Sequence, residues 1–349
     1  MFISDTIRHL ILIFGSFLLA FISGFFLAKP FIQLLIHKKM TKNIREDATG
    51  GGKAPLFRQL HLKKTGTPTM GGILIWGISI LIILFSRVLS YIGIFEHSLL
   101  NRKETYLPVA TLLVTALLGA IDDFLNIKGK NNGLSAKFKF FWLSLFGLAG
   151  GLWFHYKLNY DLIHIPLIGD LPIGLWYIPL FAFVIVASAN AVNITDGLDG
   201  LSGGLIVMAF AIFGSIAFAK GLFILSAFCA VLIGATLAFL WYNIPPALFY
   251  MGDTGSLALG ATLGVIAMLT NSVVILPIIG IIFVIETLSV IIQLFSKKYF
   301  KKKVFHIAPL HHHFEYIGWN NATITMRFWF IGGIFGALGL ILALISVQI

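Results

Sequence analysis

The chain is dominated by about ten apolar runs, each close to the roughly 20 residues that an α-helix needs to cross a bilayer. Only 11% of the residues are charged, whereas a soluble domain carries about 25%. The sequence therefore predicts an all-α polytopic membrane protein, with about ten transmembrane helices in a single domain of residues 1–349. The runs cover residues 9–36, 68–92, 105–123, 138–156, 176–193, 202–219, 222–241, 255–270, 273–296 and 325–347.

Basic residues are concentrated between particular runs. Segments 37–66, 124–139 and 297–303 together carry 17 of the 25 lysines and arginines. With ten spans, all three segments fall on one side of the membrane, and the positive-inside rule makes that side cytoplasmic. The net charge of +11 is thereby explained as a topology signal, so we expect no nucleic-acid partner.

Three further features bear on the topology. The first apolar run is long and lacks a small-residue cleavage site, so we expect a retained span and no cleaved signal peptide. The single cysteine, Cys229, excludes a disulfide within one chain. Segment 158–173, on the opposite side from the basic segments, has alternating side chains and predicts a small periplasmic hairpin that turns at Gly169-Asp170.

Polar motifs follow the third, fifth, seventh and ninth runs, and this parity places all of them on the predicted cytoplasmic side. Five aspartates, among the 14 acidic residues of the chain, lie in these motifs. Polar chemistry gathered on one membrane face is typical of an active site, because a random set of turns would be distributed over both faces. The motifs are Asp122-Asp123, segment 193–200, Trp241-Tyr242-Asn243, segment 251–255 and segment 309–315.

Two of these motifs point to a metal. Asp122 and Asp123 are adjacent carboxylates, which repel each other unless a cation neutralises them. Mg²⁺ is commonly held by one or two carboxylates together with substrate phosphates. Asp253 lies in a glycine-rich loop, where the backbone can approach a ligand closely. The simpler alternatives are a charged helix end in the headgroup region for the pair, and an ordinary helix N-cap formed by Asp253 or Thr254 for the loop.

The other motifs have two interpretations each. Segment 193–200 places two aspartates between long apolar runs, where ionisable residues are expensive and usually functional; the alternative is a polar turn between helices. His311–His313 cannot all face one metal from one helix face, so phosphate binding is favoured, and exposed loop histidines are the alternative. Segment 66–72 is either a polar lip over a cleft or a turn at which the chain re-enters the membrane.

Taken in order, five motifs resemble those of the bacterial phospho-N-acetylmuramoyl-pentapeptide transferases, a family within the polyprenyl-phosphate N-acetylhexosamine-1-phosphate transferase superfamily. None of the motifs is sufficient alone, but together they extend over nearly the whole chain. They are Gly66–Gly72, Asp122-Asp123, Asn190–Leu201, Met251–Ser256 and Ala308–Glu315.

This resemblance implies a Mg²⁺-dependent transferase in the bacterial cytoplasmic (inner) membrane, embedded in the lipid bilayer with its active site facing the cytoplasm. The implied substrates are UDP-N-acetylmuramoyl-pentapeptide and undecaprenyl phosphate, and the products are UMP and lipid I, an intermediate of peptidoglycan synthesis. The resemblance is compatible with a homodimer. It leaves open whether the attack is direct or passes through a covalent aspartyl intermediate.

The resemblance also assigns roles to residues by their positions in the motifs. Asp122 corresponds to the favoured base for the lipid phosphate, and Asp253 corresponds to the Mg²⁺ ligand. The implied catalytic residues are Asp122, Asp123, Asp253 and His312. The implied uridine-binding residues are Gly197, Leu198, Asp199, Asn243 and Tyr250. The other implied substrate-binding residues are Lys64, Thr69, Asn193, Asp196, Gln293, His311 and His313.

Two positions depart from the family pattern. Tyr250 stands where phenylalanine is common, and Asn126 stands where lysine is frequent. The nearest alternative function is that of a sister enzyme, which transfers N-acetylglucosamine-1-phosphate to a polyprenyl phosphate. A membrane transporter is the alternative from a different class, but it would place charges at mid-membrane or on both faces and would break helices in matched halves.

Overall fold

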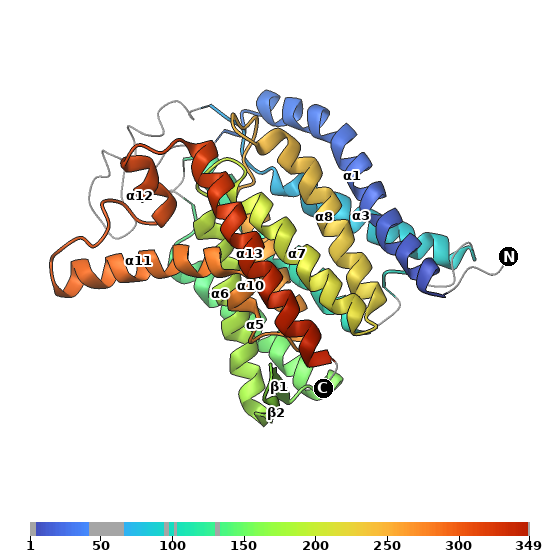
Figure 1. Ribbon diagram of the computed structural model, residues 1–349. Helices are drawn as coiled ribbons and strands as arrows, with labels where there is room; N and C mark the ends of the chain where they lie inside the picture. Colours follow the sequence, from blue (N-terminus) through green and yellow to red (C-terminus); the bar gives the residue numbers. More distant parts are fainter. Residues whose placement is uncertain (1–4, 42–65, 94–97, 101–102, 130–132, 348–349) are drawn as a thin grey trace.

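The computed structural model describes residues 5–41, 66–93, 98–100, 103–129 and 133–347 of the chain (Figure 1). Long helices dominate these residues: α1 (Asp5–His37), α3 (Gly72–Tyr91), α4 (Lys103–Ile127), α5 (Ala136–Leu158), α6 (Tyr177–Thr195), α7 (Leu201–Ala219), α8 (Phe223–Asn243), α9 (Asp253–Leu269), α11 (Ile281–Tyr299) and α13 (Asn321–Val347). The shorter elements are strands β1 (Leu162–Ile165) and β2 (Gly169–Pro172), and helices η2 (Gly174–Trp176), α10 (Leu276–Ile279) and α12 (Leu310–Tyr316).

Nine of the ten predicted apolar runs fall mainly on one long helix each, and the prediction of an all-α polytopic membrane protein is confirmed. Within the described residues, seven helices are long and apolar enough to cross a membrane: α1, α3, α4, α6, α7, α8 and α13. Helix α9 is apolar but has only 17 residues. Helix α11 carries Glu286 and two terminal lysines, and the ninth run is divided at Gly280 between α10 and α11.

The helices differ in what surrounds them. Helix α9 is central, because it packs against α4 and α6 and every residue from Thr254 to Leu269 is buried. Helices α1 and α13 instead expose large apolar side chains such as Phe14, Phe26 and Phe330. Such side chains are at no disadvantage in lipid, whose tails are as apolar as leucine. The central helix α9 is therefore surrounded by other helices, and the outer helices α1 and α13 face the bilayer.

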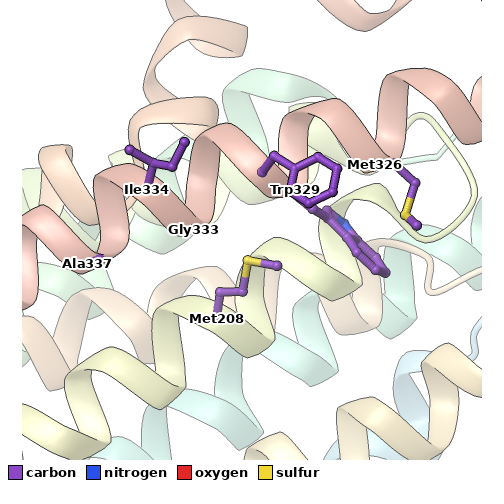
Figure 2. A pocket seen from close by; sticks show the side chains of 7 residues that line it. Met208, Met326, Trp329, Gly333, Ile334 and Ala337 are labelled. Atoms are coloured by element: carbon purple, nitrogen blue, oxygen red, sulfur yellow. The ribbon is translucent and has the colours of Figure 1, made fainter.

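An apolar groove of about 480 Å³ lies between α7 and α13 (Figure 2). Met208 of α7 and Trp329 and Ile334 of α13 line it, and its walls are almost wholly apolar. None of the predicted site residues lines this groove. It is a feature of the apolar surface and is separate from the polar motifs.

Glycines let two helices approach the start of α9. A Cβ atom at Gly119 of α4 would collide with the backbone carbonyl of Asp253, and one at Gly72 of α3 would collide with the backbone of Gly255. Small residues at helix contacts allow backbones to come close, as is common in membrane proteins. These contacts set where the first turn of α9 lies.

Replacing Gly119 with alanine is therefore expected to push α4 away from α9 and to destabilise the fold by about 1–3 kcal/mol, as overpacking does. Thermal unfolding in detergent measures this as a lower midpoint. Gly77→Ala in α3 is the control, because a Cβ atom there meets no atom within 4 Å. Equal midpoints for the two variants would contradict the close approach.

The predicted hairpin is confirmed, but its turn is not at Gly169-Asp170. Strands β1 and β2 are antiparallel, and Ile165 pairs with Gly169 and His164 with Asp170. The turn is formed by residues 166–168, where Pro166 has no N–H to contribute to the ladder. Gly169 and Asp170 instead belong to β2, where the Asp170 carboxylate lies 2.7 Å from His164 Nδ1.

The hairpin lies at the far end of α9 from Asp253. The Tyr160 hydroxyl donates a hydrogen bond to the carbonyl of Leu269 (3.1 Å), and the His164 N–H donates one to Asn271 Oδ1 (3.0 Å). A 17-residue helix is roughly 25 Å long. Figure 1 shows the same separation along α13, with α12 near one end and the strands near the other.

Candidate active site

Lys139 joins two of the predicted catalytic carboxylates. Its Nζ lies 2.8 Å from Asp253 Oδ2 and 3.4 Å from Asp122 Oδ2. Asp122 is near the end of α4, Lys139 is in the first turn of α5, and Asp253 begins α9. Three helix ends therefore meet at one ammonium group. The Asp122 side chain is 2% exposed, whereas those of Lys139 and Asp253 are each 18% exposed and remain accessible to a ligand.

Asn193 completes the surroundings of Asp253. Its Nδ2 donates hydrogen bonds to Asp253 Oδ1 (2.9 Å) and to Ser256 Oγ (2.8 Å). One carboxylate oxygen of Asp253 thus faces Lys139 and the other faces Asn193. This arrangement excludes the simple alternative of Asp253 as an N-cap, because Asp253 is the first residue of α9 and its carboxylate is held by other helices.

Asp123 caps α9 from another helix. Its two carboxylate oxygens accept hydrogen bonds from the backbone N–H groups of Asp253 (3.1 Å) and Thr254 (3.0 Å). The first N–H groups of a helix lack partners within the helix, and a negative charge is favourable at that end. Gly252 has a φ of 74°, and a Cβ atom there would collide with Asp123. Asp123 therefore fixes the backbone that carries Asp253.

The donor set fits a magnesium ion that substrate phosphates complete. Within the described parts of the chain, no group of three or more histidine, cysteine, aspartate or glutamate side chains is arranged to hold a metal ion. Two carboxylates, Asp122 and Asp253, already share a cation in Lys139. Mg²⁺ usually binds through one or two carboxylates with phosphates and water, and seldom in a site made wholly of protein.

A second group of predicted residues joins the loop after α6 to the segment after α8. Asn243 Oδ1 accepts a hydrogen bond from the Gly200 N–H (3.0 Å), and its Nδ2 donates one to the carbonyl of Phe249 (2.8 Å). Asp199 Oδ2 accepts a hydrogen bond from the Ala247 N–H (3.2 Å). Leu198, in the same loop, is buried at 4% exposure. Asn243 therefore shapes this loop whatever ligand it binds.

Tyr250 belongs to the same group. Burial, together with the nearby charge of Asp199, raises the pKa of its phenol to about 12, although a hydrogen bond with Thr67 opposes the shift. The folded protein therefore favours the neutral phenol, and this contribution is complete below the ordinary pKa near 10 and is lost as the pH rises through about 12. At neutral pH, Tyr250 presents an uncharged ring, as the family's phenylalanine would.

The three adjacent histidines lie on the short helix α12, and each has a different neighbour. His311 Nδ1 is 3.1 Å from Glu286 Oε2, and His312 Nδ1 is 2.6 Å from Glu315 Oε2. The His313 ring stacks on that of His306, with centroids 5.4 Å apart. The alternative of exposed loop histidines is wrong for His311 and His312, which are 0% and 6% exposed.

The remaining predicted site residues have no described contact with Lys139. Thr69 is buried near Gly252 and Asp123. Asp196 is the C-cap of α6, and the ring of His311 lies against Gly197. Gln293 holds the segment after α11, accepting hydrogen bonds from the N–H groups of Val304 and Phe305 (3.0 Å each) and donating one to the Phe305 carbonyl (2.8 Å). Lys64 lies outside the described residues.

The sequence prediction missed Lys139 and Glu286. Lys139 was counted only among the basic residues that set topology, yet a lysine in the first turn of a helix is unfavourable unless acids are near. Glu286 lies in the apolar run 281–294, and an ionisable residue inside a membrane span is usually functional. Both signals were present in the sequence.

Comparison with known proteins identifies the class of this membrane protein. Residues 106–271, which include Asp122, Lys139 and Asp253, match the family Glycosyl transferase family 4. The chain is 40% identical over 360 residues to the phospho-N-acetylmuramoyl-pentapeptide-transferase of Chloroflexus aurantiacus, covering 98% of this chain and 91% of that protein. It is 38% identical over 330 residues to the protein of the same name from a Geobacillus species, covering 93% and 96%.

The fold and these matches define a membrane-embedded phosphoglycosyl transferase, so the prediction of an enzyme is confirmed. The chain belongs to the phospho-N-acetylmuramoyl-pentapeptide-transferase family. The resemblance inferred from the five motifs is thereby confirmed, and the transporter alternative is wrong.

Proposed function

We propose that this chain transfers phospho-N-acetylmuramoyl-pentapeptide from its UDP conjugate to undecaprenyl phosphate. The names of the relatives support this choice of substrates over that of the sister enzyme. The observation that carries the proposal is the pair of carboxylates, Asp122 and Asp253, held by one lysine at the ends of three helices. Such a site suits two substrates that both carry phosphate.

The reaction exchanges one phosphoanhydride for another. An oxygen of the lipid phosphate forms a bond to the sugar-linked phosphorus of the UDP conjugate. The bond from that phosphorus to the bridging oxygen breaks, and UMP leaves with the bridging oxygen and the electron pair. Because little energy is gained or lost, the protein's task is to neutralise and align two anions. Lys139 supplies one fixed positive charge for this purpose.

Mg²⁺ is the proposed cofactor, and Asp253, with Asp122 near it, would hold it. When bound, the ion would neutralise charge on the phosphates. Asp122 is the proposed base for the lipid phosphate, and Lys139 and the Leu134 N–H orient its carboxylate. Asp123 is proposed to act by positioning, because both of its oxygens hold the start of α9. His312 stays a catalytic candidate, oriented by Glu315.

The activity predicts a specific assay result. Purified protein in detergent is expected to release UMP from UDP-N-acetylmuramoyl-pentapeptide only when polyprenyl phosphate and Mg²⁺ are both present, and a chelator is expected to stop release. Equal consumption of UDP-N-acetylglucosamine would favour the sister enzyme. If the folded, metal-replete protein consumes neither nucleotide sugar, the proposed function is wrong.

We also place the acidic site on the cytoplasmic side of the inner membrane, since the basic segments lie on that side. The only cysteine, Cys229, is fully buried, so introduced cysteines can be tested against little background. Lys38 and Asn159 are both exposed. In intact cells an impermeant thiol reagent is expected to label Asn159→Cys and to spare Lys38→Cys. The reverse pattern would overturn the topology.

A further inference from the structure

Glu286 is a fully buried acid within the apolar helix α11. Its Oε1 accepts a hydrogen bond from the backbone N–H of His311 (3.1 Å), and its Oε2 lies 3.1 Å from His311 Nδ1. Both side chains are 0% exposed. A charge that is fully buried without a partner is costly. A carboxylate at position 286 therefore needs the histidine beside it. The pair ties α12 to α11.

The other edge of the His311 ring faces the loop that follows α6. A Cβ atom at Gly197 would collide with His311 Nε2, so the glycine is needed to admit the ring. This Nε2 is buried and has no hydrogen-bond partner among the described residues, and the same holds for His311 Nδ1 and Glu286 Oε2, which face each other at an ion-pair distance. A buried polar atom without a partner is costly unless a ligand completes it. The loop it faces contains Asp199, which belongs to the predicted nucleotide site.

We propose that Glu286 is a positioning residue, which holds His311 so that Nε2 donates a hydrogen bond to the diphosphate of a bound uridine nucleotide. This inference rests on the proposed function, because it assumes that a UDP conjugate binds beside Gly197. The two contacts of Glu286, one to the His311 backbone N–H and one beside Nδ1, fix the orientation of the ring, so that Nε2 faces the Gly197 loop. The loss of Glu286 therefore weakens a phosphate contact through His311.

The test compares the binding of UDP and of uridine to the full chain in detergent by calorimetry, without turnover. Glu286→Gln keeps an oxygen for the His311 N–H but removes the charge. We expect it to weaken UDP binding by about tenfold, the scale of one hydrogen bond to a charged group. Uridine, which lacks phosphate, should bind within about twofold of the wild type, a change that is small on this scale.

Two controls separate positioning from general damage. Ser289→Ala removes another buried polar group one turn along α11, whose hydroxyl donates a hydrogen bond to the Glu286 carbonyl. It should leave both affinities and the unfolding midpoint unchanged. In a His311→Ala background, Glu286→Gln should have no further effect on UDP binding, because Glu286 acts through that ring.

Several results would overturn the inference. The first is an unchanged UDP affinity in Glu286→Gln, and the second is an equal loss of affinity for UDP and for uridine. The third is that Glu286→Gln weakens UDP binding as much in the His311→Ala background as in the wild type. None of these depends on turnover. Failure of the muramoyl conjugate to react in the UMP assay would instead reject the proposed function and leave the binding comparison interpretable.

Discussion

Asp253→Asn is expected to lower turnover by at least about a thousandfold, the scale of losing a group that stabilises charge in the transition state. The asparagine keeps the size of the side chain and can still contact Asn193, which lies 2.9 Å away. It loses the negative charge that pairs with Lys139 at 2.8 Å and that would hold Mg²⁺. The measurement is UMP release at saturating substrates over a range of Mg²⁺ concentrations.

Asp170→Asn is the matched control for Asp253. Asp170 is also an aspartate paired with a basic side chain, but it lies in the hairpin at the far end of α9. The control should turn over like the wild type. Near-normal release by Asp253→Asn at ordinary Mg²⁺ would remove Asp253 from the site, whereas loss of activity in both variants would point to a general effect on folding.

Lys139→Met is expected to lower turnover by about a hundredfold to a thousandfold, since a preorganised charge near the reacting groups is lost. The variant leaves the carboxylates of Asp122 and Asp253 without their shared cation. Mg²⁺ can replace part of that charge, so the unfolding midpoint should fall more without Mg²⁺ than with it. Assays of UMP release and of thermal unfolding, each with and without Mg²⁺, measure both effects.

Lys137→Met is the control, because Lys137 is in the same turn of α5 and its side chain is exposed. It removes an identical charge from the same membrane face and should leave turnover unchanged. If Lys139→Met behaved like Lys137→Met, Lys139 would be only a topology signal, as its place among the basic segments first suggested.

The helices were predictable because their lengths follow from the bilayer. Each run of roughly 20 apolar residues must satisfy its own backbone, and a helix is the way for a single segment to do so. The hairpin was predicted from alternating side chains in segment 158–173. Such a pattern indicates strands but does not determine which residues pair across them. Its turn was misplaced because glycine and aspartate favour turns, whereas here Pro166 and Leu167 form the turn and Asp170 pairs across the strands.

The site was predicted in its parts but not in its connections. Asp122 and Asp253 each follow an odd number of apolar runs, so the sequence indicated that they share a membrane face. This prediction needed only the number of membrane crossings. It could not show that Asp123 caps α9, because that contact joins residues 130 positions apart through the packing of α4 on α9. The role of Lys139 depends on the same packing, 114 residues from Asp253.

The burial of α9 has a consequence for how the enzyme responds to its membrane. A span that touches lipid must tilt, stretch the bilayer or shift when the hydrocarbon thickness changes. Helix α9, with 17 residues, is at the short limit for a span and is buried along its length, whereas α1 and α13 expose apolar side chains to the lipid. We therefore expect the position of Asp253 to depend on the neighbouring helices and to vary little with membrane thickness.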